Sequence, residues 1–390
     1  MLDTGKNISY EYDSLNRLTK ETNLAIGSEW RYTYDNGGNI TKKEEYNPAT
    51  GALRSSWDYG YGDSYWKDQL TSWGSYGTSS FAYDSSGNPT KYKDSTLTWE
   101  GKRPVKYAES DTKYTDLSYD GNGMLTGIMQ VQNYVIWGGA VATNVYSKEI
   151  TRDGDRILSE KVTNIDGTLL TNEVKNIKYC YDADGICGMF VDGNQYFFRR
   201  NIFGDVTEIY DKNGVKKAEY AYDAWGTCHL MLDTDGVGSL NPFRYRGYYM
   251  VSCIGLYYLT TRFYDYTTGR FLNADVPSIC FDDGLTLPEG CNLYSYCRNN
   301  PISYVDPTGH FALIIGILLM TTMIGGTIGG IVSHSNGKSG WGLVGDIILG
   351  AMIGLAAGGL IIATIGAIAY GIFGATTTVL GGVAASKAFA

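Results

Sequence analysis

The side chains most able to take part in chemistry are seven aspartates, each directly preceded by a tyrosine. They are Asp13, Asp35, Asp84, Asp120, Asp182, Asp211 and Asp223. A row of carboxylates suits Ca²⁺ binding or acid–base catalysis. Each of these aspartates, however, is followed within two to four positions by Gly or Asn, and each recurs with this turn-forming sequence instead of converging on one site. We therefore expect them to accept hydrogen bonds from the backbone of their own turns.

Cysteine and histidine are the candidates for a metal site. Cys291 with Cys297, or Cys228 beside His229, would supply ligands, but no CxxC spacing occurs and the chain holds only three His. The seven cysteines are an odd number in a long chain, whereas disulfide frameworks belong mainly to small secreted domains. We expect unpaired, mostly buried thiols, and neither a metal nor a cofactor.

The elements that position these residues are repeats. The segment YEYDSLNRLTK at residues 10–20 reappears at 32–42 and 81–91, and weaker copies lie at 117–126, 179–185, 209–214 and 220–226. Aromatic residues two positions apart share one face of a strand, and Gly or Asn takes the left-handed conformation of a hairpin turn. A second strand begins at the Thr. The pattern predicts an all-β fold of antiparallel hairpins stacked edge to edge, although residues 131–178 and parts of 50–78 fit it poorly.

Composition agrees with many short strands and turns. The chain has 33 Tyr, 50 Gly and only 8 Pro, and its net charge is −9. Acidic and basic residues are interspersed up to about residue 310, and no Lys/Arg run suggests a nucleic-acid partner. The first residues lack a basic stretch followed by an apolar one. We expect either export by another route or a piece of a longer protein.

The repeated Tyr-x-Tyr-Asp-x-x-Gly/Asn-x-x-Thr pattern resembles the YD repeat of RHS proteins, of the C component of insecticidal Tc toxins and of teneurins. In that family such hairpins coil into a hollow β-cocoon. The resemblance implies that residues 1–202 form part of such a shell.

Residues 203–310 resemble the RHS repeat-associated core domain, which plugs one end of the cocoon. The resemblance rests on NPFRYRGYY (241–249), GLYYLTTRFYD (255–265), TGRFLNAD (268–275), NLYSYCRNNP (292–301) and DPTG (306–309).

Many family members cut their own chain just after the Asp-Pro-x-Gly motif, in an aspartyl-protease-like reaction. By position, the resemblance makes Asp306 one catalytic carboxylate and Asp275 its partner, with Arg298 or Arg270 orienting the pair. Cleavage would then fall at Gly309, His310 and Phe311. Two carboxylates that share a proton suit such a step, because one activates water while the other protonates the carbonyl.

This chain departs from the family at that site. His310 replaces the usual Leu, Val276-Pro277 follows Asp275 where Pro alone is usual, and Asp282 and Asp283 are rival partners. The alternative is that residues 306–309 form only a tight turn that Asp306 caps.

The tail, residues 311–390, is almost uncharged. Residues 311–333 and 347–386 lack charge, and each stretch is long enough for membrane-spanning helices. Glycines at helical spacing favour close helix packing in lipid. They are Gly325, Gly329, Gly350, Gly354 and Gly358. The expectation is an α-helical, glycine-rich transmembrane tail with two or more helices.

The leading hypothesis is a non-catalytic β-shell scaffold of a polymorphic toxin, exported or at the cell surface and inserted in the membrane by its tail. Its expected partners are an enclosed C-terminal toxin, an immunity protein and the lipid membrane. The alternative is a membrane-anchored adhesion protein whose sheet binds carbohydrate or protein. Any self-cleavage would be single-turnover.

Overall fold

The computed structural model of the 390-residue chain describes residues 7–136, 138–182, 185–275, 292–310 and 313–314. These residues form short antiparallel strands, which confirms the all-β hairpin fold predicted from the repeats. The strands of the main sheet are β1 (Ile8–Tyr12), β2 (Leu18–Asn23), β3 (Ser28–Tyr34), β4 (Ile40–Tyr46), β5 (Leu53–Gly60), β6 (Ser72–Gly74), β7 (Ser79–Tyr83), β8 (Pro89–Tyr92), β9 (Ser95–Glu100), β10 (Arg103–Ser110), β11 (Lys113–Tyr119), β12 (Leu125–Val135), β13 (Val141–Asp153), β14 (Arg156–Asp166), β15 (Thr171–Asp182), β16 (Gly185–Val191), β17 (Asn194–Arg200), β18 (Val206–Asp211), β19 (Lys216–Tyr222) and β20 (Cys228–Asp233). The remaining elements are α1 (Val237–Leu240), β21 (Tyr249–Val251), β22 (Leu256–Tyr258), β23 (Phe263–Asp265), β24 (Arg270–Phe271), β25 (Tyr304–Val305) and β26 (Leu313–Ile314).

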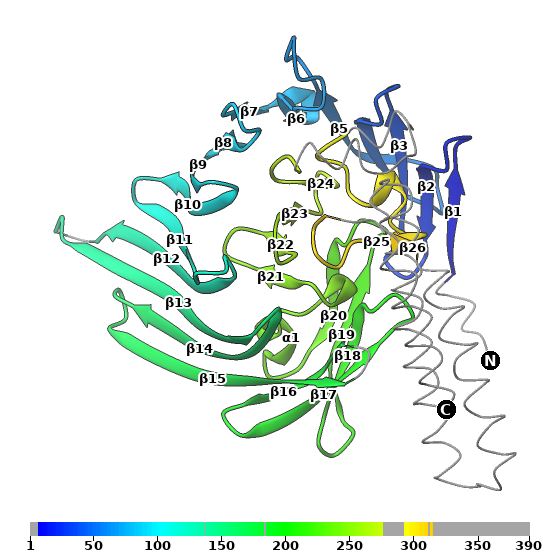
Figure 1. The fold of residues 1–390 in the computed structure, drawn as a ribbon. Coiled ribbons are helices and arrows are strands. Elements are labelled where there is room, and N and C mark those ends of the chain that lie inside the picture. Colours follow the sequence, from blue (N-terminus) through cyan, green and yellow to red (C-terminus); the bar gives the residue numbers. More distant parts are fainter. Residues whose placement is uncertain (1–6, 137, 183–184, 276–291, 311–312, 315–390) are drawn as a thin grey trace, which may run out of the picture. The chain divides into compact units, whose positions relative to one another are not determined.

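Strands β1 to β20 form one continuous ribbon in which each strand pairs with the next along the chain. The ribbon curves, so that β18–β20 return to the side of β1 and β2 (Figure 1). The ladder register shifts at the tyrosine that precedes the repeat aspartate, for example between Thr33 and Tyr34 and between Ala82 and Tyr83. Such bulges bend a strand and increase its twist, which supports the curvature of the ribbon.

Six of the seven repeat aspartates cap their turns, as the sequence predicts, and the turn after Asp182 lies partly outside the described residues. Asp84 Oδ1 accepts hydrogen bonds from the main-chain nitrogens of Ser86 (2.8 Å) and Asn88 (2.9 Å). The same pair of bonds, to the residues two and four positions later, occurs at Asp13, Asp35, Asp120, Asp211 and Asp223. The carboxylates therefore stabilise separate hairpins along the ribbon.

In five of the repeats the tyrosine before the aspartate ties its hairpin to the preceding one. The hydroxyl of Tyr83 donates to the carbonyl oxygen of Leu70 at 3.1 Å, and that of Tyr119 donates to Pro104 at 2.8 Å. Equivalent bonds come from Tyr34, Tyr181 and Tyr222. Tyr61, which Gly62 follows, makes the same kind of bond to the carbonyl of Ile40. The buried ring supplies apolar contact while its hydroxyl satisfies a carbonyl, which explains why the repeat favours Tyr over Phe.

The described residues from 237 to 275 and from 292 to 310, called here the inner segment, lie within the curve of the ribbon (Figure 1). Strands β21, β22, β23 and β24 form a small antiparallel sheet whose residues are all buried. Its rings pack closely, with the centroids of Tyr264 and Tyr296 4.1 Å apart. The inner segment thus supplies much of the hydrophobic core on which the ribbon packs.

Polar side chains of the inner segment bind the turns of widely separated repeats. Asn300 Nδ2 donates to the carbonyl of Asn16 (2.8 Å) and Asn299 Nδ2 donates to that of Gly38 (2.7 Å). The hydroxyl of Tyr294 donates to Gly87 O at 2.9 Å. These bonds hold three distant hairpins around one segment.

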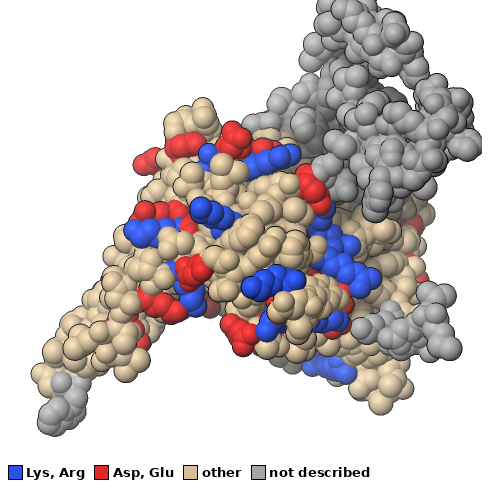
Figure 2. Space-filling view, turned by 90° about the horizontal axis from the view of Figure 1, so that it is seen from below, with Lys and Arg blue, Asp and Glu red and all other residues tan. Residues whose placement is uncertain are grey.

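The stretch that fits the repeat poorly forms two long hairpins. Strands β12 to β15 contain 11 to 13 residues each, so the turn signal of the repeat is absent there. Elsewhere on the face shown in Figure 2, Lys and Arg are interspersed with Asp and Glu.

The predicted helices of residues 311–390, with their glycines 325, 329, 350, 354 and 358, lie outside the described residues. Within the part of the chain that is described, no helix has the length and apolarity needed to cross a membrane. The ribbon itself ends at Asp233, inside the predicted core-associated segment 203–310. The boundaries at 202 and 310 remain predictions.

Candidate functional site

Asp275 and Asp306, which the sequence pairs, face the same buried guanidinium. Arg262 Nη2 lies 2.6 Å from Asp275 Oδ2 and 3.9 Å from Asp306 Oδ2. All three residues are at most 5% exposed. Arg262 precedes β23, Asp275 follows β24, and Asp306 follows β25, so three separate parts of the inner segment build the site.

Asp306 also organises the turn that follows it. Its Oδ1 accepts hydrogen bonds from the main-chain nitrogens of Thr308 (3.3 Å), Gly309 (2.7 Å) and His310 (3.1 Å). This is the capping geometry that the sequence offers as the alternative to catalysis. One oxygen of Asp306 caps the turn while the other faces Arg262, so the two interpretations are compatible.

The chain at residues 308–310 is held from the other side by residues 261 and 262. Thr261 Oγ1 donates to Thr308 O at 2.6 Å, and Arg262 Nε donates to Gly309 O. Gly309 has φ +88, and a Cβ there would lie 2.7 Å from Thr261 Oγ1. Glycine is therefore required for the turn to approach Arg262 so closely.

His310, the departure from the family pattern, contacts the carboxylate pair directly. Its Nδ1 lies 2.8 Å from Asp275 Oδ1, and its side chain is 34% exposed. A leucine could not make this contact. The imidazole therefore adds a polar ring to the pair of carboxylates.

Burial governs the electrostatics of the site. Burial lowers the pKa of Arg262 from its ordinary value, and the carboxylates of Asp275 and Asp306 oppose that shift. Burial likewise raises the pKa of Tyr248, whose hydroxyl donates to the carbonyl of Asp306 at 2.8 Å. Two carboxylates and a guanidinium that are buried, with a partly exposed imidazole at their edge, can activate a water molecule and polarise a nearby carbonyl.

The arginines singled out from the sequence lie elsewhere in the inner segment. Arg270 Nη1 contacts Asn39 Oδ1 (3.1 Å) and the hydroxyl of Tyr61 (3.2 Å), where it joins the inner segment to the ribbon. Arg298 lies in a tight turn with φ +53. Sequence reasoning missed Arg262, although it stands inside the quoted motif GLYYLTTRFYD. Asp282, Asp283 and Phe311 lie outside the described residues.

The five cysteines that are described are free thiols, as expected. Cys297 is buried, whereas Cys180, Cys187, Cys228 and Cys253 are partly exposed, so burial was overestimated. Among the described residues, no group of three or more His, Cys, Asp or Glu is arranged to hold a metal ion. Cys280 and Cys291 are not among them.

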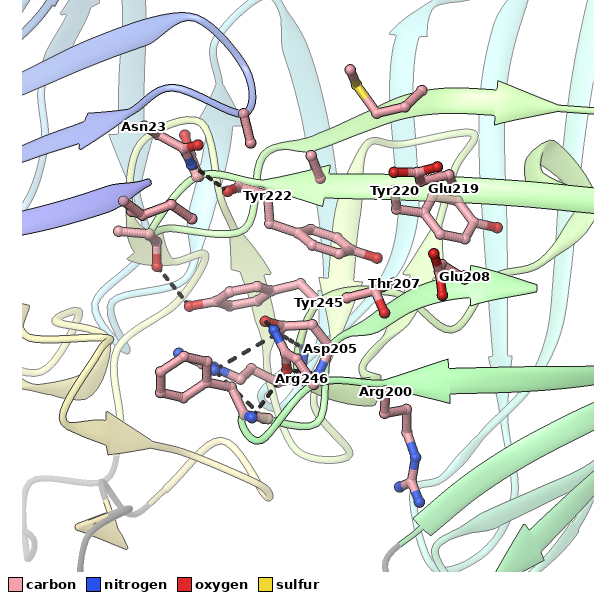
Figure 3. A pocket seen from close by; sticks show the side chains of 18 of the residues that line it. Asn23, Arg200, Asp205, Thr207, Glu208, Glu219, Tyr220, Tyr222, Tyr245 and Arg246 are labelled. Atoms are coloured by element: carbon pink, nitrogen blue, oxygen red, sulfur yellow. Dashed lines mark hydrogen bonds and ion pairs between the residues drawn. The ribbon is translucent and has the colours of Figure 1, made fainter. Parts of the chain in front are cut away.

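A cavity of about 420 Å³ lies where the first strands meet β17–β20 (Figure 3). Tyr220, Tyr222 and Tyr245 line it together with charged residues. Those charges are already balanced by ion pairs, since Arg199 contacts Glu208 at 2.8 Å and Arg246 contacts Asp205 at 3.8 Å.

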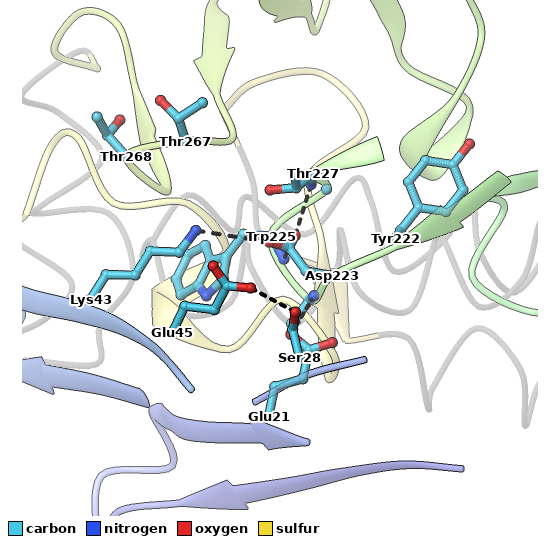
Figure 4. Close-up of polar contacts among 12 residues, drawn as sticks. Glu21, Ser28, Lys43, Glu45, Tyr222, Asp223, Trp225, Thr227, Thr267 and Thr268 are labelled. Carbon is cyan, nitrogen blue, oxygen red and sulfur yellow. Dashed lines mark hydrogen bonds and ion pairs between the residues drawn. The ribbon is translucent and has the colours of Figure 1, made fainter. Parts of the chain in front are cut away.

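Next to this cavity, side chains rather than a strand ladder join the two ends of the ribbon. The carboxylates of Glu21 and Asp223 are buried side by side, with Lys43 Nζ 3.8 Å from Asp223 Oδ2 (Figure 4). Burial raises the pKa of Glu21 to about 8, and Asp223 adds to that shift. Burial beside Asp223 therefore favours the protonated form of Glu21.

Known proteins share this architecture. Among curated proteins, the chain is 31% identical over 311 residues to the tRNA3(Ser)-specific nuclease WapA of Bacillus spizizenii, which covers 78% of this chain and 12% of that protein. It is also 31% identical over 310 residues to the tRNA nuclease WapA of Bacillus subtilis, again covering 12% of the relative. The chain thus spans about an eighth of these relatives.

Solved structures share the fold. The Tc holotoxin pore of Photorhabdus luminescens matches with a TM-score of 0.61 at 19% identity, over 79% of this chain and 15% of that one. The TcdB2-TccC3-Cdc42 structure matches with a TM-score of 0.61 at 20% identity, over 77% and 15%. A family model described as the teneurin YD-shell matches residues 2–302. Its match covers both the ribbon and most of the inner segment, and the chain therefore belongs to the teneurin YD-shell family.

Proposed function

We propose that this chain is the shell scaffold of a polymorphic-toxin-type protein, which encloses or displays the polypeptide that follows residue 310. One observation carries the proposal: the inner segment, which leads directly into residue 310, is bonded to the turns of repeats near Asn16, Gly38 and Gly87. The following polypeptide is thereby tethered to the ribbon at a fixed point. The similarity to WapA nucleases supports a toxin setting. No substrate is carried over, because the chain matches only 12% of each.

The second part of the proposal is a single cleavage of the chain's own backbone within residues 309–311. Asp275 takes a proton from water, and the resulting hydroxide adds to the carbonyl carbon of His310. The bond to the nitrogen of Phe311 breaks, the proton passes to that nitrogen, and the products are a carboxylate at His310 and an amine at Phe311. Asp306 holds the turn through Oδ1, and its Oδ2 side is the second carboxyl of the pair, which hydrogen-bonds the scissile carbonyl in its protonated form and keeps that proton afterwards. Arg262 lies at the adjacent carbonyl of Gly309 to counter the developing negative charge.

The third part concerns the tail. Residues 311–390 are proposed to insert into a lipid membrane after release, because they combine long uncharged stretches with glycines at helical spacing. Growth arrest on expression of residues 311–390 alone, relieved in the full chain, would support restraint of an effector by the shell. An immunity protein would be expected to relieve the arrest as well.

Intact-mass measurement of the purified full chain tests the cleavage. The wild-type chain should give a fragment that begins at Phe311, and Asp306→Asn and Asp275→Asn should remain whole. Asp84→Asn is a matched control, because Asp84 caps a turn with the same bonds to the residues two and four positions later. It should cleave like the wild type. An uncleaved wild-type chain would reject self-processing and leave the scaffold proposal to the growth experiment.

A further inference from the structure

The two long hairpins carry apolar side chains at their ends that the shell does not use. Strands β12 and β13 pair out to Val135 and Val141. The turn between β14 and β15 lies beside them, because the nitrogen of Gly167 donates to Asn144 Oδ1 at 2.9 Å. The ends of the two hairpins, called here the hairpin tips, are residues 133–136, 138–143 and 166–171 among those described.

The hairpin tips expose large apolar residues to an unusual degree. Leu170 is 90% exposed, Val135 79%, Leu169 71% and Val141 64%. Single exposed apolar residues are normal on protein surfaces, but clusters mark sites of interaction. The clustering at two adjacent turns therefore requires a functional explanation.

Leu170 is also in a costly conformation. Its φ is +55, in the left-handed region, where Gly or Asn is the favoured residue. In an exposed turn a glycine would satisfy the backbone without placing an isobutyl group in water. Fold stability therefore does not account for this leucine, and its side chain needs a contact outside the chain.

The hairpin tips hold a single charged residue, Asp166, whose carboxylate accepts hydrogen bonds from the main-chain nitrogens of Thr168 and Leu169 in its own turn. No Asp, Glu, Lys, Arg or His occurs from residue 121 to residue 147, nor from 167 to 172. In Figure 2 the outer part of the projecting hairpins accordingly shows neither blue nor red. Val135 and Val141 lie on one face of their hairpin, and Tyr134 and Ile136 are exposed on the other. Apolar side chains are therefore exposed on both faces of this hairpin end, as an element immersed in a lipid interface requires.

We propose that the hairpin tips insert into the interface of a lipid membrane and dock the shell there. Because the tips carry no Lys or Arg, with Asp166 as their one charged residue, and the chain has a net charge of −9, the expected surface is a zwitterionic one, and binding should not depend on anionic lipid or weaken with salt. Tyr134 is an amphipathic side chain suited to the headgroup level. This docking goes beyond the proposed scaffold role and does not require the tail.

Flotation of the full chain with phosphatidylcholine vesicles tests the docking. The double variant Val135→Glu/Leu170→Glu should lose vesicle affinity by roughly tenfold or more, since two apolar side chains can no longer be buried in the lipid. Val215→Glu/Leu53→Glu is a matched control, because these residues are 52% and 54% exposed elsewhere on the ribbon, Leu53 at the start of β5 and Val215 just before β19. The control should bind like the wild type.

Hydrogen–deuterium exchange separates the hairpin tips from the tail. Vesicles should slow exchange at least threefold in peptides covering residues 133–143 and 166–171, and leave residues 79–100 unchanged. Vesicle binding without protection at the tips, as tail insertion alone would give, overturns the proposal. So does a lipid-free dimer that the double variant dissociates, or an absence of vesicle binding, which would favour a second copy or a protein partner.

Discussion

The main-chain nitrogen of Ala224 donates a hydrogen bond of 2.8 Å to Oε2 of Glu21, although the two residues are 203 positions apart. Beside it, Asn23 Nδ2 donates to the carbonyl oxygen of Tyr222 at 2.9 Å. The first and last hairpins of the ribbon are thus joined through side chains. The titratable groups that face Glu21 are Asp223, Lys43, Tyr10, Tyr12 and Tyr32.

This junction should make stability depend on pH. The pKa of Glu21 is about 8 in the folded chain against an ordinary value of 4.5, so the folded state binds more protons between these values and loses stability as pH rises through that window. Glu21→Gln removes this dependence. The free energy of unfolding of the variant should therefore rise relative to that of the wild type between pH 5 and about 8.5, by an amount on the order of a few kcal/mol at most, as measured by denaturant unfolding at each pH. A difference that stays constant with pH would contradict the assignment.

Removing the guanidinium from the candidate site should destabilise the fold. Arg262→Met would leave Asp275 and Asp306 buried without their cation, at a cost of about 3–5 kcal/mol in denaturant unfolding. Adding Asp275→Asn and Asp306→Asn to this variant should restore part of the loss. Equal losses in the single and triple variants would mean that the charges do not interact.

A second buried pair provides an internal comparison. Lys148 Nζ and Glu160 Oε2 are 2.9 Å apart and buried, whereas Lys161 and Glu149 on the same two strands are 3.1 Å apart and exposed. Lys148→Met should cost about 3–5 kcal/mol, because Glu160 loses its counter-charge inside the core. Lys161→Met should cost no more than about 1 kcal/mol. Similar unfolding midpoints for the two variants would contradict this difference.

The turn at Gly87 should be intolerant of any side chain. Gly87 has φ +76, and a Cβ there would lie within 2.8 Å of Trp66, Ala274 and Tyr294. Gly87→Ala should lower the free energy of unfolding by about 2–5 kcal/mol, from backbone strain and overpacking together. Gly101→Ala isolates the backbone cost, since Gly101 has φ +62 with nothing within 4 Å, and should lose only about 1 kcal/mol.

The repeated units were predictable because their information is local. Aromatic spacing, the capping aspartate and the turn residue all lie within about ten positions, and the strand–turn–strand unit and the capping role of Asp13, Asp35 and Asp84 are confirmed. The pairing of Asp275 with Asp306 came from motif resemblance, and the two residues do lie at one guanidinium.

Other features have no local signal. Arg262 and Gly309 meet across 47 positions, and the role of Arg262 depends on how β23 and the turn after β25 pack in three dimensions. The long hairpins could not be predicted from the repeat pattern for a different reason. Their strands of 11 to 13 residues exceed the spacing of the repeat, so no turn motif of the repeat marks their ends. The junction of Glu21 with Ala224 likewise depends on the curvature of the whole ribbon.

Strictly sequential strand pairing lets the ribbon tolerate changes in its number of units. A hairpin gained or lost by tandem duplication or deletion leaves the partners of every other strand unchanged, as long as the curve still accommodates the inner segment. Only repeats whose turns are engaged by a dedicated residue, such as Asn16 by Asn300 and Gly38 by Asn299, are tied to a particular place in the order. Natural variation in length should therefore accumulate between those repeats.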